Sequence, residues 1–395
     1  MIRWGDPVLS DLLAGAFLAL LTLVWATLCL TAGKYGERFR LTPAEPPPPR
    51  WPSVSVCIPA RDEEGRVGEA VRLALASDYP DLEVVVVDDR SRDNTGEEAR
   101  AAAAGDPRFR LVMGTEPPAG WAGKPWACLR AAGESRGELL LFLDADVEIA
   151  PWTVRAAVAR LQNGQHQLLS VFGDWRLETF WERAVIPVVG WFIRGAVNLD
   201  AVNEPGRPEA FANGQLILTT RAAYDAVGGH EAVRAEVLDD VRLARAYKRR
   251  VLSTVMLYAP GSFTVRLYRN LGEVIRGYGK NLYEGMDRRP LLGIGAMLFI
   301  LVSTLGPYAL FLTLAITPIW PGWALAGPGW TLWAAVIVGL IHLFRYRVER
   351  ADGRSGWHSL THPIGNVIFL FILARSIFGV EADWKGRRFV DGRAA

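Results

Sequence analysis

Cysteine is scarce in this chain, and neither sign of charge is in clear surplus. Cys29, Cys57 and Cys128 are the only three cysteines among 395 residues, and they lack the spacing of metal ligands. We expect all three to be reduced and buried, as is usual in the cytosol. The formal net charge is +2, and no basic stretch is interleaved with aromatic residues. The sequence therefore predicts no nucleic acid partner.

Charged residues are also missing from two long stretches. Residues 12–30 contain none, and residues 291–344 contain no Asp, Glu, Lys or Arg. The first stretch is long enough to span a bilayer and lacks a small-residue cleavage site, so we interpret it as a retained anchor. The second is long enough for two spanning helices, broken around Pro318, Pro321 and Pro328.

A third apolar stretch, residues 364–380, is shorter and carries Arg375 near its middle. Such a segment more often lies in the interface or re-enters the membrane than spans it, and the sequence leaves this open. By the positive-inside rule, basic flanks face the cytoplasm. These flanks are residues 34–50, 288–289 and 345–354. We expect an inner (plasma) membrane protein with residues 34–290 in the cytoplasm.

The composition changes along the chain predict six segments. They are an N-terminal transmembrane anchor (1–34), a proline-rich linker (35–52), a cytosolic domain (53–268), an interfacial segment (269–290), a transmembrane hairpin (291–344) and a C-terminal membrane-associated segment with its tail (345–395). The linker holds six prolines between Pro43 and Pro52, which is typical of a stiff, extended spacer.

The cytosolic domain reads as alternating strands and helices. Strands are expected at 54–59, 82–87, 109–113 and 139–143, and helices at 63–76, 95–104 and 124–135. The helix at 63–76 has its apolar residues on one face. This alternation predicts an α/β fold, with a mainly parallel sheet covered by helices on both faces.

Asp144 and Asp146 follow an apolar run, residues 139–143, that reads as a buried parallel strand. Residues two apart on a strand point the same way, so both carboxylates can face one place at the carboxyl end of the strand. Open α/β sheets bind ligands at that end. Paired carboxylates without a nearby His or Cys suit Mg²⁺ or Mn²⁺, which usually serve a phosphorylated substrate.

Other polar turns allow two interpretations each. Asp88 and Asp89 end a strand, where they can bind a nucleobase or ribose or simply cap a turn. Lys124 opens a helix after a glycine-rich turn without P-loop spacing, and it can contact a diphosphate. Asp239 and Asp240 precede a helix, whose dipole alone would favour them.

Taken together and in order, these motifs resemble the family 2 glycosyltransferases of the GT-A fold. The matching segments are Ile58-Pro59-Ala60-Arg61-Asp62-Glu63-Glu64, Val85-Val86-Val87-Asp88-Asp89-Arg90-Ser91 with Asp93-Asn94-Thr95, Gly123-Lys124, Leu143-Asp144-Ala145-Asp146 and Asp239-Asp240 with Leu243. The anchor, the glycine-tryptophan turn before Lys124, residues 280–283 and residues 384–387 are similar to membrane-bound enzymes that glycosylate lipids, among them carotenoid- and hopanoid-associated transferases.

The resemblance implies a role for each matching residue of a catalytic domain at 53–268. Asp88 and Asp89 would hold the uracil or guanine of a UDP- or GDP-sugar, with Pro59 and Ala60 beside the base. Arg61, Glu63 and Lys124 would complete the donor site. Asp144 and Asp146 would hold the divalent metal, Mn²⁺ or Mg²⁺, against the diphosphate. Asp240 would be the catalytic base, with Asp239 as its neighbour; His230 is interpreted as structural.

The Gln-x-x-Arg-Trp signature of processive polysaccharide synthases is absent. We therefore expect an inverting transfer of one sugar to a hydroxyl of a membrane lipid. One alternative is a polyprenyl-phosphate sugar or polysaccharide synthase of the same fold. Another is a sugar-nucleotide-binding membrane protein without catalysis, although degenerate transferases commonly lose an acid that is present here. A transporter would need polar groups inside its spanning segments, and these are nearly absent.

Overall fold

The computed structural model of the chain describes residues 7–32, 37–316 and 328–379, and the backbone of 381–384, 387–390 and 393–394. The chain divides into two compact units. The sheet unit comprises Gly36–Leu177, Ile193–Arg269 and Val380–Ala395, and the helical unit Met1–Tyr35, Glu178–Phe192 and Asn270–Gly379. Some features named above lie outside the described residues: Lys34, Pro318, Pro321, Lys385 and Gly386.

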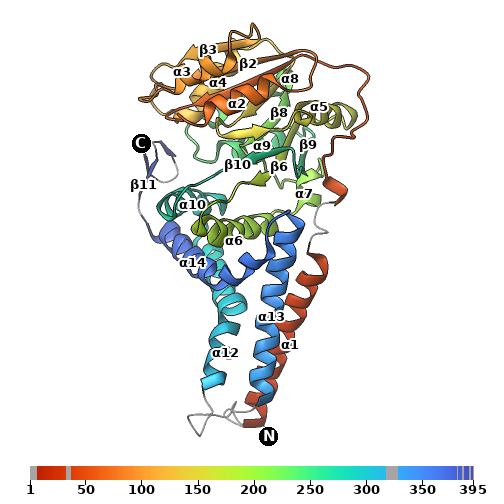
Figure 1. Cartoon of the computed structure of the whole chain (residues 1–395), viewed down its shortest axis with the longest axis vertical. Helices are drawn as coiled ribbons and strands as arrows, with labels where there is room; N and C mark the ends of the chain where they lie inside the picture. Colours follow the sequence, from red (N-terminus) through yellow and green to blue (C-terminus); the bar gives the residue numbers. More distant parts are fainter. Residues whose placement is uncertain are drawn as a thin grey trace. The chain divides into compact units, whose positions relative to one another are not determined.

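The sheet unit is built on seven strands in the order β3-β2-β1-β4-β8-β6-β9 (Figure 1). They are β1 (Val54–Ala60), β2 (Leu82–Asp88), β3 (Phe109–Met113), β4 (Leu139–Leu143), β6 (Leu168–Phe172), β8 (Leu216–Thr220) and β9 (Thr254–Tyr258). Only β8 runs antiparallel to its neighbours, β4 and β6. The mainly parallel sheet predicted from the sequence is therefore confirmed.

Alternate residues of the central strands face two separate cores. Val56 and Ile58 pack with α2 (Val67–Leu75), α3 (Thr95–Ala103) and α5 (Thr153–Asn163). Cys57, between them, packs with α4 (Gly123–Glu134), α8 (Arg221–Val227) and α9 (Asp239–Arg249) on the other face. Strands buried on both faces need continuous apolar sequence, which is what β4 and residues 84–87 of β2 have. The prediction of helices on both faces is confirmed.

Shorter elements complete the sheet unit. A small sheet has the order β5-β10-β7, from Val147–Ile149, Phe263–Val265 and Asp174–Trp175. Helix α7 spans Leu199–Asn203, and an antiparallel sheet near the C-terminus joins β11 (Glu381–Trp384), β12 (Arg387–Val390) and β13 (Arg393–Ala394).

The helix predicted from residue 63 begins only at Val67, so the prediction of its first turn is wrong. Asp62 and Gly65 have positive φ angles of 51° and 77°, which a helix does not allow. The backbone N–H of Glu63 donates to Thr95 Oγ1 at 2.8 Å instead of entering a helix. The segment after β1 is therefore a polar turn held by the loop that follows β2.

The proline-rich linker packs on the sheet unit instead of acting as a free spacer. Leu41 is buried and its N–H donates to the Tyr258 carbonyl at 2.8 Å. Arg160 of α5 donates to both carboxylate oxygens of Glu45, at 2.6 and 2.8 Å. These contacts fix the chain that leads into β1.

The helical unit contains the segments predicted to be apolar helices. They are α1 (Pro7–Thr31), α11 (Pro290–Phe299), α12 (Gly306–Ile316), α13 (Pro328–Ala351) and α14 (His362–Phe378); a π-helical turn, Ile300–Leu305, joins α11 to α12. By length and composition, four stretches can cross a membrane: Asp11–Thr31, Pro290–Ile316, Pro328–Ala351 and Gly356–Phe378. The last includes Arg375, so whether it spans stays open.

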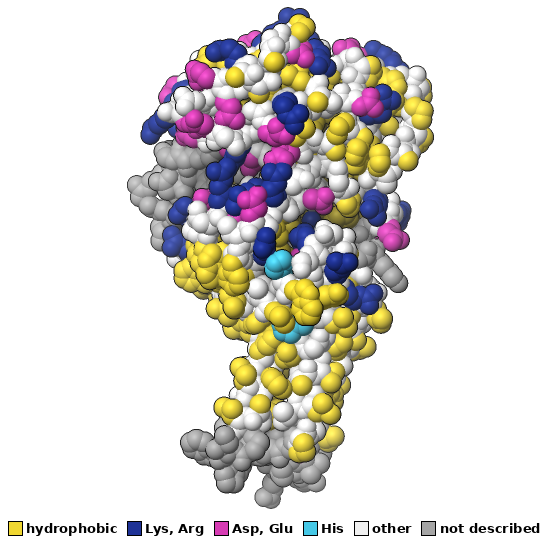
Figure 2. Space-filling view, viewed as in Figure 1, with side chains coloured by type: hydrophobic (Ala, Val, Ile, Leu, Met, Phe, Trp, Pro, Cys, Tyr) yellow, Lys and Arg dark blue, Asp and Glu magenta, His cyan; other side chains and the backbone are white. Residues whose placement is uncertain are grey.

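Hydrophobic side chains cover the surface of α1, α12 and α13, where Figure 2 shows few charged groups. Several of these residues are more than half exposed, which is expected for helices that face lipid and not water. They include Leu12, Leu20, Leu23, Leu30, Leu312 and Leu332.

One part of the predicted cytosolic domain groups with the helical unit. Residues 178–192 form most of α6 (Phe180–Ala196), whose middle, residues 184–190, is buried. Arg345 of α13 donates to the Arg183 carbonyl at 2.8 Å, and the Phe192 and Phe369 ring centroids are 5.1 Å apart. The same unit holds α10 (Leu271–Gly285), where the Tyr283 N–H donates to Ser376 Oγ of α14 at 3.1 Å.

Candidate active site

The ends of β1 and β2 lie side by side because the strands pair in parallel, with Pro59 opposite Val87 and Ala60 opposite Asp88. The N–H of Asp89 donates to the Ala60 carbonyl at 2.7 Å. Directly after Ala60, the Arg61 guanidinium lies 3.7 Å from the Asp89 carboxylate. The residues that the sequence assigned to the base and the donor are therefore neighbours.

Asp88 and Asp89 differ in what their carboxylates contact. Asp88 accepts the N–H of Ser91 at 2.9 Å, which closes the turn after β2. Asp89 is also buried, but its carboxylate lies between two guanidinium groups, Arg61 at 3.7 Å and Arg90 at 3.4 Å. Asp88 thus shapes the turn, and Asp89 carries negative charge among cations at the sheet edge.

Asp144 and Asp146 follow β4 at the same edge of the sheet. The N–H of Asp144 donates to the Gln215 carbonyl at 3.3 Å, and the Asp144 carbonyl accepts the N–H of Val147 at 3.1 Å. The two acids therefore lie on a turn between β4 and β5. Lys124, in the first turn of α4, places its Nζ 2.5 Å from Asp144 Oδ1.

Lys124 is held in its charged form by these acids. Burial alone would lower the pKa of Lys124, but Asp144 and Asp239 raise it well above its usual range. A permanently charged ammonium beside Asp144 is suited to a polyanionic ligand such as a diphosphate.

Asp146 lies in an excess of negative charge. Burial, Asp144 and Glu63 raise the pKa of Asp146 to about 7, and Arg66 and Lys124 compensate only in part. Glu63 comes from the turn after β1. Its charge acts on Asp146, so this turn lies close to the metal-ligand candidates. Crowded carboxylates with raised pKa values are typical of sites that hold a cation or perform acid-base chemistry.

Asp240 is tied to the same edge through the segment before β8. Its Oδ2 accepts the N–H of Gly214 at 2.8 Å, and its Oδ1 accepts the N–H of Val241 at 2.7 Å. Because β8 pairs antiparallel with β4, Leu216 lies opposite Leu143, next to the acids that follow β4. The five segments that match the family motifs therefore lie at one edge of the sheet.

Asp239 points in a different direction from Asp240. Its carboxylate is buried, 3.9 Å from His230 Nε2. Burial and Lys124 lower the pKa of His230 to about 3, so the imidazole is neutral. The interpretation of His230 as a structural residue stays a prediction.

Gly214 leaves room for the Asp240 carboxylate, and this carries a prediction. A Cβ on residue 214 would lie 2.9 Å from Asp240 Oδ2 and 3.3 Å from Lys124 Nζ, so both side chains would have to shift. If Asp240 is the base predicted from the sequence, Gly214→Ala should lower turnover by about 10²-fold, the typical cost of moving a reacting group by about 1 Å.

The matched control is Gly133→Ala on α4, where an added Cβ meets nothing within 4 Å. It should leave turnover unchanged and preserve the fold, because alanine favours a helix. Steady-state rates of both variants, with circular dichroism to check folding, test the contact. Equal rates in the two variants would show that Gly214 does not position Asp240.

Comparison with known proteins identifies the domain that contains this edge. Residues 55–206 match the family described as Glycosyl transferase family 2. The chain carries a family 2 glycosyltransferase domain. This match confirms the family resemblance seen in the sequence, and with it the enzyme class.

Curated relatives of this glycosyltransferase match beyond that domain. The 4,4'-diaponeurosporenoate glycosyltransferase of Staphylococcus aureus strain MRSA252 is 26% identical over 352 residues, which cover 85% of this chain and 88% of the relative. The protein of the same name from strain bovine RF122 / ET3-1 is 25% identical with the same coverage.

Among solved structures, a mannosyltransferase from Pyrobaculum calidifontis in complex with GDP-Man and Mn²⁺ is similar with a TM-score of 0.47 and 20% identity. The match covers 82% of this chain and 96% of the mannosyltransferase. The glucosyl-3-phosphoglycerate synthase of Mycobacterium tuberculosis with Mg²⁺ and uridine-diphosphate has a TM-score of 0.38 and 20% identity, covering 57% and 75%.

Proposed function

We propose that this glycosyltransferase moves a single sugar from a UDP- or GDP-sugar to a membrane lipid, with inversion at the anomeric carbon. One observation carries the proposal: acids from four separate segments lie at the carboxyl edge of the sheet, and a fifth segment places Lys124 beside Asp144 and near Asp239. A nucleoside diphosphate needs cations and hydrogen-bond acceptors within one such site.

The residues at the edge fit a divalent cation, Mn²⁺ or Mg²⁺. Asp144 and Asp146 offer oxygen ligands, and the raised pKa of Asp146 marks negative charge that a cation would relieve. When bound, such an ion would neutralise charge that develops on the leaving nucleoside diphosphate. Lys124 would supply further positive charge to the same phosphates.

Asp240 would take the proton from the acceptor hydroxyl as it attacks the anomeric carbon on the face opposite the nucleotide. Two backbone N–H groups fix its carboxylate, from Gly214 and Val241. This orients one base before the substrates arrive, and positioning of this kind supplies much of the acceleration in enzymes. A single displacement would give a β-linked product from an α-linked donor.

The pH dependence of transfer follows from the environment of Asp240. Burial and Asp239 raise the pKa of Asp240 to about 6, against the opposing effects of Lys124 and the hydrogen bonds from Val241 and Gly214. A base works only when ionised, so kcat/KM should fall as the pH drops through about 6. It should stay level on the alkaline side.

Asp239→Asn removes a charge that raises the pKa of Asp240. The acidic limb of the pH profile of this variant should therefore move to lower pH. Profiles of kcat/KM against pH for the two proteins, at saturating Mn²⁺, measure the shift. A wild-type profile that stays flat through pH 6 would contradict Asp240 as the base.

We propose a carotenoid-type lipid as the acceptor, reached from the cytoplasmic side of the inner membrane. The apolar helices in the same chain and the name of the S. aureus relatives support this class. That name denotes a carboxylate, which favours a second candidate: transfer to a carboxylate oxygen, giving a glycosyl ester. An ionised carboxylate needs no base, so the dependence of the rate on Asp240 separates the two candidates.

The proposal is tested by incubating membranes that contain the protein with labelled UDP- and GDP-sugars and Mn²⁺. The lipids are then extracted and analysed by mass spectrometry. We expect label from one donor in one lipid class of defined mass, and none when Asp146→Asn membranes are used. Absence of labelled lipid from every donor would contradict the proposal.

A further inference from the structure

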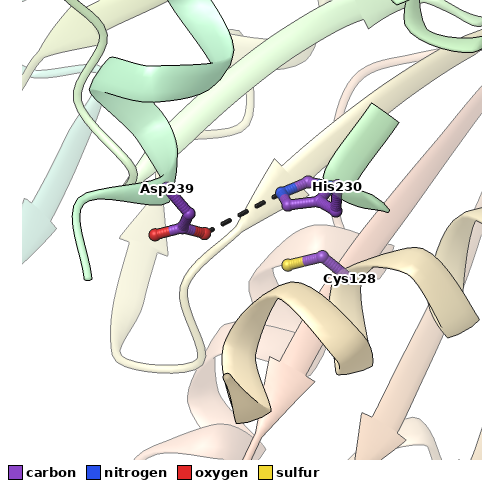
Figure 3. A group of neighbouring side chains, drawn as sticks. All are labelled: Cys128, His230 and Asp239. Carbon is purple, nitrogen blue, oxygen red and sulfur yellow. Dashed lines mark ion pairs between the residues drawn. The ribbon is translucent and has the colours of Figure 1, made fainter. Parts of the chain in front are cut away.

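Three potential metal ligands from separate elements lie close together in the sheet unit. They are Cys128 on α4, His230 in a 3₁₀ turn (Gly229–Val233) and Asp239 at the start of α9. One sulfur, nitrogen or oxygen atom from each lies within 4.8 Å of the other two. The residues are 1%, 3% and 6% exposed. Figure 3 shows the imidazole nitrogen and the sulfur facing the Asp239 carboxylate.

The spacing of these atoms suits a shared ion better than direct hydrogen bonds. His230 Nε2 and Asp239 Oδ2 are 3.9 Å apart, too far for a hydrogen bond. Two ligands at about 2.0–2.2 Å from a tetrahedral zinc ion lie about 3.3–3.6 Å from each other. A shift of a few tenths of an ångström, on the order of ordinary side-chain adjustment, would bring the pair to that separation.

The second ring nitrogen of His230 has a hydrogen-bond partner, and in the tautomer whose Nδ1–H donates to it, Nε2 keeps the lone pair that a metal ion needs. Nδ1 of the imidazole lies 2.9 Å from the Tyr224 hydroxyl, which also accepts the His230 backbone N–H at 3.1 Å. The Phe142 ring packs edge-on against it, with centroids 4.6 Å apart. A partner on the second ring nitrogen and an apolar shell are typical of metal sites, and they leave Nε2 facing Cys128 and Asp239.

We propose that Cys128, His230 and Asp239 bind one thiophilic divalent cation of the zinc type. A thiolate and an imidazole select such ions over Mg²⁺ and Mn²⁺, so this site is chemically distinct from the all-oxygen pair of Asp144 and Asp146. Thiolate and carboxylate together balance the charge of the ion. The ammonium of Lys124 is nearby, but its ion pair with Asp144 offsets its repulsion.

The test is a titration of the purified, reduced full chain in detergent with Co²⁺, at saturating Mg²⁺ to occupy oxygen-only sites. We expect one equivalent to bind with a thiolate-to-metal charge-transfer absorbance. Cys128→Ser should abolish this band. Cys29→Ser and Cys57→Ser, the matched controls at the other two thiols, should keep it.

Tyr224→Phe supplies a second variant that keeps the thiol and the fold. It should weaken Co²⁺ binding by about 10–100-fold, the usual effect of losing the partner of a ligating histidine. A wild-type chain without the band, or a folded Cys128→Ser chain that retains it, would overturn the site. The readout does not involve sugar transfer, so it is independent of the proposed function.

Discussion

Asp240→Asn is expected to lower the rate of sugar transfer to a hydroxyl acceptor by roughly 10²–10⁴-fold, the usual contribution of a general base. Asparagine keeps the shape of the side chain, and its Oδ1 can still accept a backbone N–H. It cannot take a proton from the acceptor. Donor affinity should change little. Lys124, which we assign to the diphosphate, forms its ion pair with Asp144, and the substitution leaves that pair in place.

Two measurements make this prediction sharp. Turnover is followed with labelled donor in membranes, and nucleotide affinity is measured by calorimetry on the purified protein. Asp225→Asn on α8 is the matched control, since Asp225 is an exposed acid in the same unit. Unchanged turnover in Asp240→Asn with a hydroxyl acceptor would remove this residue as the base. A loss of nucleotide binding of equal size would place it in the donor site instead.

Asp146→Asn should abolish metal-supported transfer, with a loss of at least about 10³-fold. Divalent cations supply several kcal/mol of charge stabilisation in such reactions, and each 1.36 kcal/mol is tenfold in rate. The substitution leaves the Lys124 to Asp144 ion pair in place, so it tests the cation site alone. Turnover at a series of Mn²⁺ concentrations measures the effect.

The unfolding temperature of Asp146→Asn shows whether the variant is inactive because it lacks the cation site or because it does not fold. Because burial, Asp144 and Glu63 raise the pKa of Asp146 to about 7, the ionised carboxylate destabilises the folded protein at and above neutral pH without a cation. Asp146→Asn should therefore unfold at a higher temperature than the wild type in chelator, yet remain inactive. Glu97→Gln, an exposed acid on α3, is the control. An active Asp146→Asn enzyme would contradict the cation site.

Local sequence patterns predicted the parts of the fold that depend on local physics. Four strands and the carboxylates at their ends followed from apolar runs that end in acids, because parallel strands carry their ligand sites at one edge. The resemblance to family 2, which rests on the order of these motifs, pointed to Asp240. The structure adds that Asp88 closes a turn through Ser91, the alternative that the sequence left open.

The remaining features depend on contacts between distant residues, which leave no periodic pattern. The N–H of Gly214 donates to Asp240 across 26 positions of the sequence. Positive φ angles at Asp62 and Gly65 delay the start of α2 to Val67, which is also the first residue of its apolar period. Cys128 lacks any ligand spacing with His230, and the two meet because α4 packs against the 3₁₀ turn.

The most direct test of the account is the Mn²⁺ dependence of UDP and GDP affinity in the purified full chain. A cation held between the acids at the sheet edge and the diphosphate predicts that a chelator weakens binding of one nucleotide by at least about tenfold. Asp146→Asn should show the weak affinity with or without Mn²⁺. Equal affinity of the wild type in Mn²⁺ and in chelator would contradict the central claim.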